Sequence, residues 1–531
     1  MASASAATLS TAAPPTVTPP GVPEIFAGKS WYKWIATATV ILGMMGSVLS
    51  STMVNIAIPN IMGAYGIGQD QAHWMATAFF TTMPVFMLLN GWFVNALGQR
   101  GAYLLAVLVF AAASLLGQFM PDYYGLVVVR AIQGACAGLL QPLTMTVMFP
   151  LFPPEQRGRA MGIYGMGFIL GPSFGPTLGG FIVDYMHWRN VFGFSIPLML
   201  VAAVMGMSLP RRAPGQRRPK LNWASLVCVA AAIISFLVGI SNAPRFGWQA
   251  PNVFGFLFLS ASTFTAFVVI EIVTANPLLQ VRLFAIRSFT ISMVVAFMFG
   301  FGMFGSFYIL PLFTQTVLDY TAIKAGVLMM YTGLMMVPVF PVGGRLAQSL
   351  PSGIPISLGM SMFGVASLVL AGATIDSSFW TVCLWAGIGR IGLGIALPSL
   401  QTGALRDVPA DLLAYGAGTL NFVRMTGAAI GTNGLAIFLD QRTIYHADYL
   451  AATQTPDNLR TGEFLDRVSG MLADQGIGSA EQMPLAVNYL GRVVASQAND
   501  MAFHDGFMVL AVGFMLAALS ALMLVGRRRR A

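Results

Sequence analysis

The chain has 531 residues, of which 56% are hydrophobic and only 9% are charged, and its formal net charge at pH 7 is +9. This composition excludes a soluble enzyme and indicates an all-α polytopic membrane protein, because each helix that crosses a bilayer core about 30 Å thick needs about 20 apolar residues. The sequence has no Walker A pattern, no cluster of metal ligands and no disulfide framework. We therefore expect no enzymatic activity, no cofactor, no metal and no nucleic-acid partner.

The first 30 residues are rich in Ala, Ser, Thr and Pro and carry no positive charge before Lys29. A signal or transit peptide would carry basic residues here, so we predict a disordered cytoplasmic tail over 1–30. At the other end of the chain, 527–531 form a short basic tail.

Fourteen apolar runs between these tails predict transmembrane helices. They lie near 34–57, 72–94, 102–119, 123–149, 160–183, 190–209, 223–243, 251–272, 288–314, 325–344, 355–374, 379–403, 413–438 and 504–526. Basic residues favour cytoplasmic loops, and most loop arginines fall on the cytoplasmic side when both termini are placed there. The longest outer loop, 440–502, is net acidic.

Two pairs of segments repeat along the chain. VRAIQGACAGLLQPL (129–143) resembles GRIGLGIALPSLQTG (389–403), and GWFVNALGQRG (91–101) resembles GRLAQSLPSGI (344–354). Such symmetry predicts two related six-helix bundles around a midplane cavity, as in secondary transporters. We therefore expect an N-terminal bundle at 31–210, a basic linker at 211–222, two inserted helices at 223–287 and a C-terminal bundle at 288–526. The linker is interpreted as an anchor on anionic lipid, with a regulatory site as the alternative.

The first predicted span carries the stretch VLSSTMVNIAIPNI (48–61). Its polar side chains include Ser50, Thr52 and Asn55, which we expect in the transport pathway. No acid occurs in this stretch. Glu271, at the cytoplasmic end of the eighth span, is interpreted as a boundary residue.

Three arginines lie deeper within predicted spans, at positions 130, 390 and 424. A charge is costly in lipid, so each is a functional candidate; the alternative is a structural clamp that donates hydrogen bonds to a neighbouring helix. For Arg130, the companions Gln133 and Gln141 on a stripe expected to face the cavity favour a functional role. For Arg390 and Arg424 both interpretations stay open.

The fifth span contains GMGFILGPSFGPTLGG (165–180), in which glycines recur every fourth residue. Glycines four residues apart leave one face of the helix without side chains, so another helix can approach closely. Proline removes backbone hydrogen bonds and permits bending. The pattern therefore predicts a helix that packs closely and flexes between states. Its residues are Gly167, Gly171, Pro172, Gly175, Pro176, Gly179 and Gly180.

Together with RAIQG, RGRAMGIYGMG and WRNVFGFSIP, these motifs resemble the drug:proton antiporters of the major facilitator superfamily, EmrB/QacA type. The resemblance covers nearly all of 30–526. It implies a major facilitator fold with two inserted helices, fourteen spans in all, and export of hydrophobic or amphipathic compounds by alternating access. It also assigns a gating motif to Gly91, Asn95, Gly98 and Arg100, a pathway arginine to Arg130, and an antiporter signature to the fifth span.

Three acids of that family pattern are missing. Ser50 stands where the first span of the family carries an aspartate, and Asn95 and Asn222 replace two others. A serine does not exchange a proton near neutral pH. The resemblance therefore implies transport, whereas proton coupling is implied by the family alone and by no acid at these three positions.

The resemblance leaves three functions to compare. The first is an efflux permease of the bacterial cytoplasmic (inner) membrane, with small hydrophobic substrates and the lipid bilayer as its partners. The second is a uniporter, or a carrier coupled to the charge of its substrate, and the third is a membrane scaffold or sensor without transport. A periplasmic adaptor protein and an outer-membrane channel are implied as partners, and the helical face at 483–494 is a candidate contact; the alternative is a loop folded onto its own rim.

Overall fold

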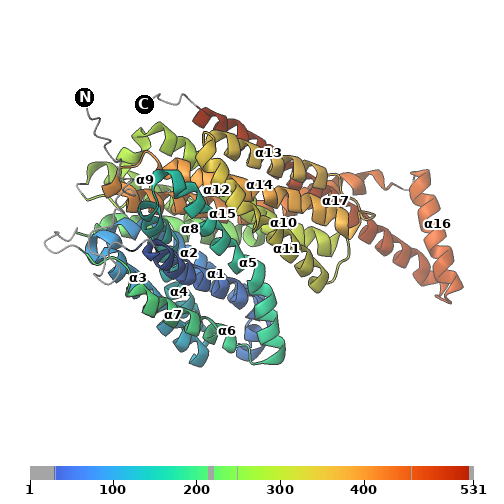
Figure 1. The fold of residues 1–531 in the computed structure, drawn as a ribbon. Helices are drawn as coiled ribbons and strands as arrows, with labels where there is room; N and C mark the ends of the chain where they lie inside the picture. Colours follow the sequence, from blue (N-terminus) through green and yellow to red (C-terminus); the bar gives the residue numbers. More distant parts are fainter. Residues whose placement is uncertain are drawn as a thin grey trace, which may run out of the picture.

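A computed structural model describes residues 29, 31–212, 220–247, 249–274, 276–455 and 457–525 (Figure 1). The expected tails at 1–30 and 527–531 lie outside the described residues, except for Lys29, and so does 213–219 of the expected linker. The described part is helical throughout, with no strand.

Seven helices occur in the described residues of the N-terminal half. They are α1 (Tyr32–Tyr65), α2 (Gln69–Leu88), α3 (Asn90–Phe119), α4 (Tyr123–Leu151), α5 (Arg157–Tyr185), α6 (Asn190–Gly193) and α7 (Ser195–Gly206). The inserted pair is α8 (Trp223–Phe246) and α9 (Pro251–Val273).

The described part of the C-terminal half has eight helices. They are α10 (Arg287–Thr316), α11 (Ala322–Met336), α12 (Val339–Ser349), α13 (Gly353–Leu370), α14 (Phe379–Leu405), α15 (Leu413–Thr453), α16 (Leu459–Asp474) and α17 (Ser479–Leu522). Short 3-10 turns occur at Pro154–Gln156, Val281–Ala285, Ala410–Leu412 and Met523–Val525.

Within the described residues, twelve helices are long and apolar enough to cross a membrane, and two shorter apolar helices, Trp74–Leu88 and Asn190–Gly206, occupy the places of the second and sixth expected spans. Every expected span therefore corresponds to helix. The second span was expected to reach 94. α2 ends at Leu88, but Leu89 keeps helical angles and the non-helical Gly98 divides α3 in two, so the first part of α3, up to Leu97, continues α2 and carries most of the 91–101 motif.

The segment expected as an outer loop, 440–502, is largely helical. It comprises the end of α15, all of α16 and the first half of α17, and we call it the extension. Figure 1 shows α16 standing away from the rest of the molecule, so the extension does not fold back onto the rim. Phe464 of α16 stacks on Tyr489 of α17, with ring centroids 6.1 Å apart. On the face expected at 483–494, Ala486 is buried, whereas Met483 and Val493 are exposed.

Basic side chains gather at the opposite end of the bundle, where α1, α3, α5, α10 and α15 begin. We call this the basic end; its residues include Lys33, Arg100, Arg157, Arg159, Arg212, Arg287 and Arg406. Lys33 Nζ donates to Gln156 Oε1 at 3.3 Å, which joins the start of α1 to the turn before α5.

Candidate substrate pathway

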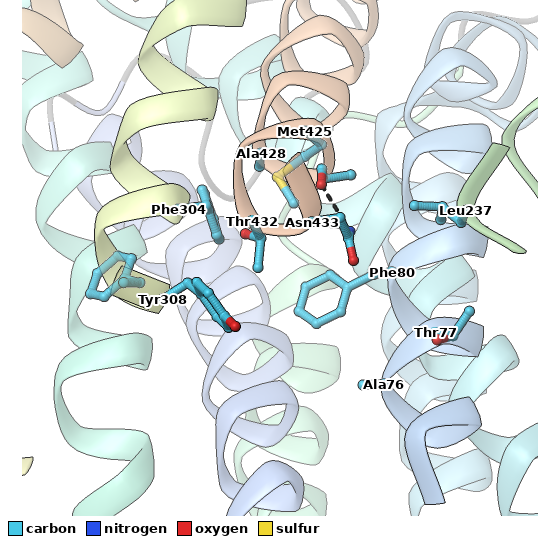
Figure 2. Close-up of a pocket in the computed structure, with 12 residues that line it drawn as sticks. Ala76, Thr77, Phe80, Leu237, Phe304, Tyr308, Met425, Ala428, Thr432 and Asn433 are labelled. Atoms are coloured by element: carbon cyan, nitrogen blue, oxygen red, sulfur yellow. Dashed lines mark hydrogen bonds between the residues drawn. The ribbon is translucent and has the colours of Figure 1, made fainter. Parts of the chain in front are cut away.

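A cavity of about 340 Å³ lies between the two halves (Figure 2). Helices α2, α8, α10 and α15 supply its walls, so one inserted helix takes part in it. Its lining residues are Ala76, Thr77, Phe80, Leu237, Phe304, Phe307, Tyr308, Met425, Ala428, Ala429, Thr432 and Asn433.

The chemistry of this cavity is apolar with a few polar groups. No charged residue is among the described residues that line it. The side-chain amide of Asn433 donates to the carbonyl oxygen of Ala429 at 2.9 Å, so its own carbonyl oxygen remains available as an acceptor (Figure 2). Thr77, Tyr308 and Thr432 add hydroxyl groups. An apolar wall with a few placed polar groups is the usual composition of a site for a small organic molecule.

A second, smaller cavity of about 50 Å³ shares three side chains with the first: Phe80, Phe304 and Met425. Its other lining residues come mainly from the N-terminal half: Val48, Ser51, Thr52, Phe79, Met83, Ala137, Gln141, Phe168 and Pro172. Here α1, α4 and α5, which carry the sequence-predicted pathway residues, reach the space between the halves.

The first-span residues take three different positions. Ser50 is fully buried, lines neither cavity, and its hydroxyl has no hydrogen-bond partner among the described residues. Its neighbour Ser51 lines the smaller cavity. Thr52 lines it too, and its hydroxyl lies 2.9 Å from the carbonyl oxygen of Leu49. Asn55 is exposed, one turn nearer the extension.

Arg130 is fully buried on α4 and bonds within the N-terminal half. Its Nη1 donates to Gln133 Oε1 at 3.1 Å, and its guanidinium lies 4.4 Å from the ring centroid of Phe79. Gln133 in turn donates to Ser114 Oγ at 2.9 Å. This network joins α4 to α2 and α3, and neither Arg130 nor Gln133 lines either cavity.

Arg424 of α15 instead joins the two halves. Its Nη2 donates to Asn421 Oδ1 at 2.7 Å and lies 3.4 Å from Gln141 Oε1 of α4. Its guanidinium lies 4.9 Å from the ring centroid of Phe168 on α5. Gln141 and Phe168 also line the smaller cavity, so Arg424 forms part of the support behind it.

Arg390 is buried in the C-terminal half, on α14. It stacks on Phe307 of α10 at 3.9 Å from the ring centroid, and Phe307 lines the large cavity. Both of its terminal nitrogens lack a hydrogen-bond partner within the described part of the chain.

At the basic end, the start of α3, with the segment expected as a gating motif, contacts the start of α15 in the other half. The side-chain amide of Asn90 donates to the carbonyl oxygen of Ala414 at 2.8 Å, and Asn95 Nδ2 lies 3.4 Å from the hydroxyl of Tyr415. A Cβ atom at Gly91 would overlap the Tyr415 ring. Only glycine at this position lets the start of α15 approach so closely.

The second half of the expected gating motif, Gly98 and Arg100, contacts the chain just before the linker. Gly98 interrupts α3 with φ 77° and ψ 166°, a conformation that side chains with a Cβ rarely adopt. A Cβ there would also lie 2.9 Å from the backbone nitrogen of Arg212. Next to it, the backbone N–H of Arg100 donates to the carbonyl oxygen of Pro210 at 3.2 Å.

The glycine stripe of the fifth span packs on α1. The stripe comprises Gly167, Gly171, Gly175 and Gly179. A Cβ at Gly171 would lie 2.6 Å from Val48, and one at Gly175 would overlap the Thr52 hydroxyl. Gly180, by contrast, has open space around a built Cβ. α5 runs as one helix through Pro172 and Pro176.

The start of α5 makes a second glycine contact, which sequence reasoning missed. A Cβ at Gly158 would overlap the carbonyl oxygen of Gly344 on α12, and one at Gly162 would lie 2.6 Å from the carbonyl oxygen of Phe340. These are contacts between the halves at the basic end. The signal was present in RGRAMGIYG, where glycines again stand four apart, and in the matching position of the repeat at 344.

Two acidic sites lie away from these two cavities, and one of them, Asp505, lines a separate open groove of about 550 Å³ between α10, α15 and α17. Glu271 of α9 is almost fully buried, and its Oε2 accepts the backbone N–H of Leu279 at 2.8 Å, so it fixes the chain that follows α9. Asp505 of α17, at the base of the extension, was missed in the sequence. Its Oδ2 lies 2.6 Å from Arg442 Nε and 2.7 Å from His446 Nε2. Both basic partners are distant in sequence, and only the pairing of α15 with α17 brings them together.

Two bundles that meet around a cavity, with two inserted helices, define a multi-pass membrane transporter. A family model described as Major Facilitator Superfamily matches residues 40–432, and the chain belongs to that superfamily.

Several proteins of this kind are similar over most of their length. The chain is 26% identical over 489 residues to the multidrug export protein EmrB of Escherichia coli (strain K12), covering 91% of this chain and 93% of that protein. It is 26% identical over 507 residues to the multidrug transporter protein MdtP of Bacillus subtilis (strain 168), covering 92% of each.

The fold is also similar to solved structures. The human organic anion transporter MFSD10 (TETRAN) matches with a TM-score of 0.59 at 15% identity, over 91% of this chain and 99% of that one. The expected major facilitator fold is thereby confirmed.

Proposed function

We propose that this transporter exports hydrophobic or amphipathic compounds by alternating access. The observation that carries the proposal is the large cavity between the halves, whose wall combines Phe80, Phe304, Phe307 and Met425 with a few hydroxyl and amide groups. Methionine and aromatic side chains adapt to ligands of different shape, which suits a broad range of substrates. The names of the similar bacterial proteins, multidrug export protein and multidrug transporter, support the same conclusion.

In our proposal the structure represents the outward-facing state of the cycle. The halves meet at the basic end through Asn90, Gly91 and Gly158, whereas the cavity is lined by Ala76 and Thr77 near the extension end of α2. The inward-facing state would separate the contacts at the basic end. The gating motif at Gly91, Asn95, Gly98 and Arg100 would then set the balance between the two states.

The pathway in this proposal includes Ser50, Thr52, Asn55, Gln141 and Arg424. Thr52 and Gln141 would contact substrate in the smaller cavity, and Arg424 would hold Gln141 in place. Arg130, Gln133 and Arg390 would act from behind the cavity walls, through Phe79 and Phe307. The glycines and prolines of the fifth span would let α1 and α5 move as one unit.

We further propose that export is linked to protons, as the family resemblance implies. No carboxylate is among the described residues lining either cavity, so the proton would be carried by Glu271 or by the Asp505–His446 pair. The same observation favours a second candidate function, a uniporter or a carrier driven by the charge of its substrate.

Inverted membrane vesicles that contain the protein test both parts. A lipophilic fluorescent dye should accumulate inside them, and replacing Phe80 and Phe304 by alanine should raise the KM because the aromatic wall is lost. If an uncharged substrate enters the vesicles only until its concentrations inside and outside are equal, and an uncoupler of the proton gradient leaves this entry unchanged, the carrier is a uniporter. If vesicles with the protein accumulate no more of a panel of lipophilic compounds than vesicles without it, the export proposal is wrong.

We place the protein in the bacterial inner membrane with both termini and the basic end in the cytoplasm. The positive charge of that end supports this orientation. The division into bundles at 31–210 and 288–526, separated by the basic linker and the inserted pair at 223–287, is part of the same proposal. A cysteine-reactive reagent that does not cross membranes should label a cysteine placed in α16 from outside the cell.

The extension would then enter the periplasm and contact an adaptor protein that leads to an outer-membrane channel. Exposed apolar side chains outside the membrane support this contact; they include Leu459, Met471, Met483 and Tyr489. A photoreactive amino acid placed at position 489 should crosslink the transporter to a periplasmic protein in intact cells. If the transporter crosslinks only to itself, the proposed adaptor contact is wrong.

A further inference from the structure

The small cavity at Arg390 differs from the surroundings of the other two intramembrane arginines. Arg130 donates to Gln133 and Arg424 donates to Asn421, and each leaves one nitrogen, Nη2 of Arg130 and Nε of Arg424, without a partner among the described residues. Arg390 is only 1% exposed, yet neither of its terminal nitrogens has a hydrogen-bond partner within the described residues. A guanidinium group stays charged in proteins, so this is a buried cation without an anion.

The aromatic ring beside Arg390 does not compensate that charge. Phe307 lies 3.9 Å from the guanidinium, and a cation above a ring is stabilised by less than the desolvation of an ion costs. A buried cation normally has an anionic partner.

The protein itself offers no such partner there. Four helices, α10, α13, α14 and α17, line the cavity. Of these only α17 carries acids: Glu481, Asp500 and Asp505. Asp505 is already bonded to Arg442, and no ion pair between Arg390 and an acid occurs in the described residues.

The cavity is sized for one small ion. Its volume is about 20 Å³, and a space of about 10 to 15 Å³ holds one water-sized sphere. Ser306 and Ser367 are among its lining residues, and both are buried. Ser306 donates to the carbonyl oxygen of Met303 at 2.8 Å, so Arg390 and Ser367 are the lining residues that could supply donors to a bound ion. The remaining wall is apolar and includes Phe363, Phe507 and Leu510.

We propose that this cavity binds a single monatomic anion of the chloride class, held by the terminal nitrogens of Arg390 in the C-terminal bundle. The anion neutralises the cation and joins α14 to α10 and α13. Polyatomic anions such as gluconate are too large for the space. This cavity shares no lining residue with the substrate cavity, from which Phe307 separates the Arg390 guanidinium, and the proposal does not depend on the proposed export.

Halide-dependent stability tests the proposal. The full-length protein, purified in detergent, is heated in sodium chloride, sodium bromide or sodium gluconate at equal ionic strength, and the midpoint of unfolding is followed. A ligand that binds only the folded state raises this midpoint as its concentration passes its dissociation constant. We expect a saturable rise of a few degrees with chloride and bromide, none with gluconate, and no difference between the salts for Arg390→Gln.

The control is Arg442→Gln, which removes a partly exposed cation and should keep the halide dependence. Bromide-soaked crystals of the parent protein provide a second readout, which stands even if Arg390→Gln does not fold. An anomalous peak beside the Arg390 guanidinium is expected. The proposal is overturned if the cavity shows no bromide, which would leave water as its occupant, or if a folded Arg390→Gln variant retains the halide dependence.

Discussion

Replacement of Gly175 by alanine tests whether the contact between α5 and α1 is as close as the structure indicates. The added methyl group would overlap the hydroxyl of Thr52 and lie 2.8 Å from Thr52 Cβ. Thr52 would have to rotate and give up its hydrogen bond to Leu49, 2.9 Å long, and the two helices would have to separate slightly.

The size of the effect follows from three contributions. Forcing an extra methyl group into a packed contact costs about 1 to 3 kcal/mol. Loss of the Thr52 hydrogen bond adds about 0.6 to 1 kcal/mol, the usual value within membranes and proteins. Alanine is favoured over glycine in a helix by about 1 kcal/mol, which offsets part of this. We therefore expect Gly175→Ala to lower the free energy of unfolding by about 1 to 3 kcal/mol.

Gly180→Ala provides the matched control, because it lies on the same helix and a Cβ there meets open space. It gains the same helix propensity without the overlap, so it should be neutral or stabilising. The assay is the thermal unfolding of purified protein in detergent, followed by dye accumulation in inverted vesicles. Thr52→Ala removes the overlapping hydroxyl and should partly rescue Gly175→Ala, with a coupling of about 1 kcal/mol. If Gly175→Ala is as stable as Gly180→Ala, or if the two substitutions are additive, α5 and α1 do not meet through this stripe.

Asn90→Ala removes the 2.8 Å hydrogen bond that joins the halves at the basic end. It should favour opening of that end by roughly 1 kcal/mol, about a fivefold change in the population of the open state. Distances between spin labels on α3 and α15 would measure this opening, and an unchanged distance distribution would show that the bond does not hold the end closed. Arg130→Ala should abolish transport while the protein still inserts, because the buried network on α4 loses its donor; full dye accumulation by a well-expressed variant would contradict this. Ser50→Asp adds a titratable carboxyl group beside the pathway and should make transport newly dependent on pH; identical pH profiles of variant and parent would show that position 50 does not reach the pathway.

The class of this protein and its membrane-spanning helices could be predicted from the sequence, because a helix that crosses the bilayer needs a long apolar run. The packing partner of the glycine stripe could not, since spacing by four shows that some helix approaches but not that it is α1. The contact of Gly158 with Gly344 could not be predicted for the same reason, because glycine spacing does not identify the partner helix.

Polar residues were harder to place than apolar ones. Ser50 and Ser51 are neighbours, yet only Ser51 lines a cavity, because successive helix positions point about 100° apart. Asp505 was overlooked because its partners, Arg442 and His446, are about 60 residues away in the chain. The extension was expected as an outer loop with a helical face only at 483–494, because its polar composition conceals the length of its helices.

The side chains shared by the two cavities have a consequence for the kinetics of transport. Phe80, Phe304 and Met425 line both cavities. When one of these side chains changes rotamer, one cavity becomes larger and the other becomes smaller. Side chains change rotamer within nanoseconds where space allows, whereas bundles rearrange over microseconds to milliseconds. The binding site therefore reshapes itself around each compound many times before the halves move once. Compounds of unlike shape should differ in how long they stay bound, while their turnover numbers converge on the single slow rate of the bundle motion.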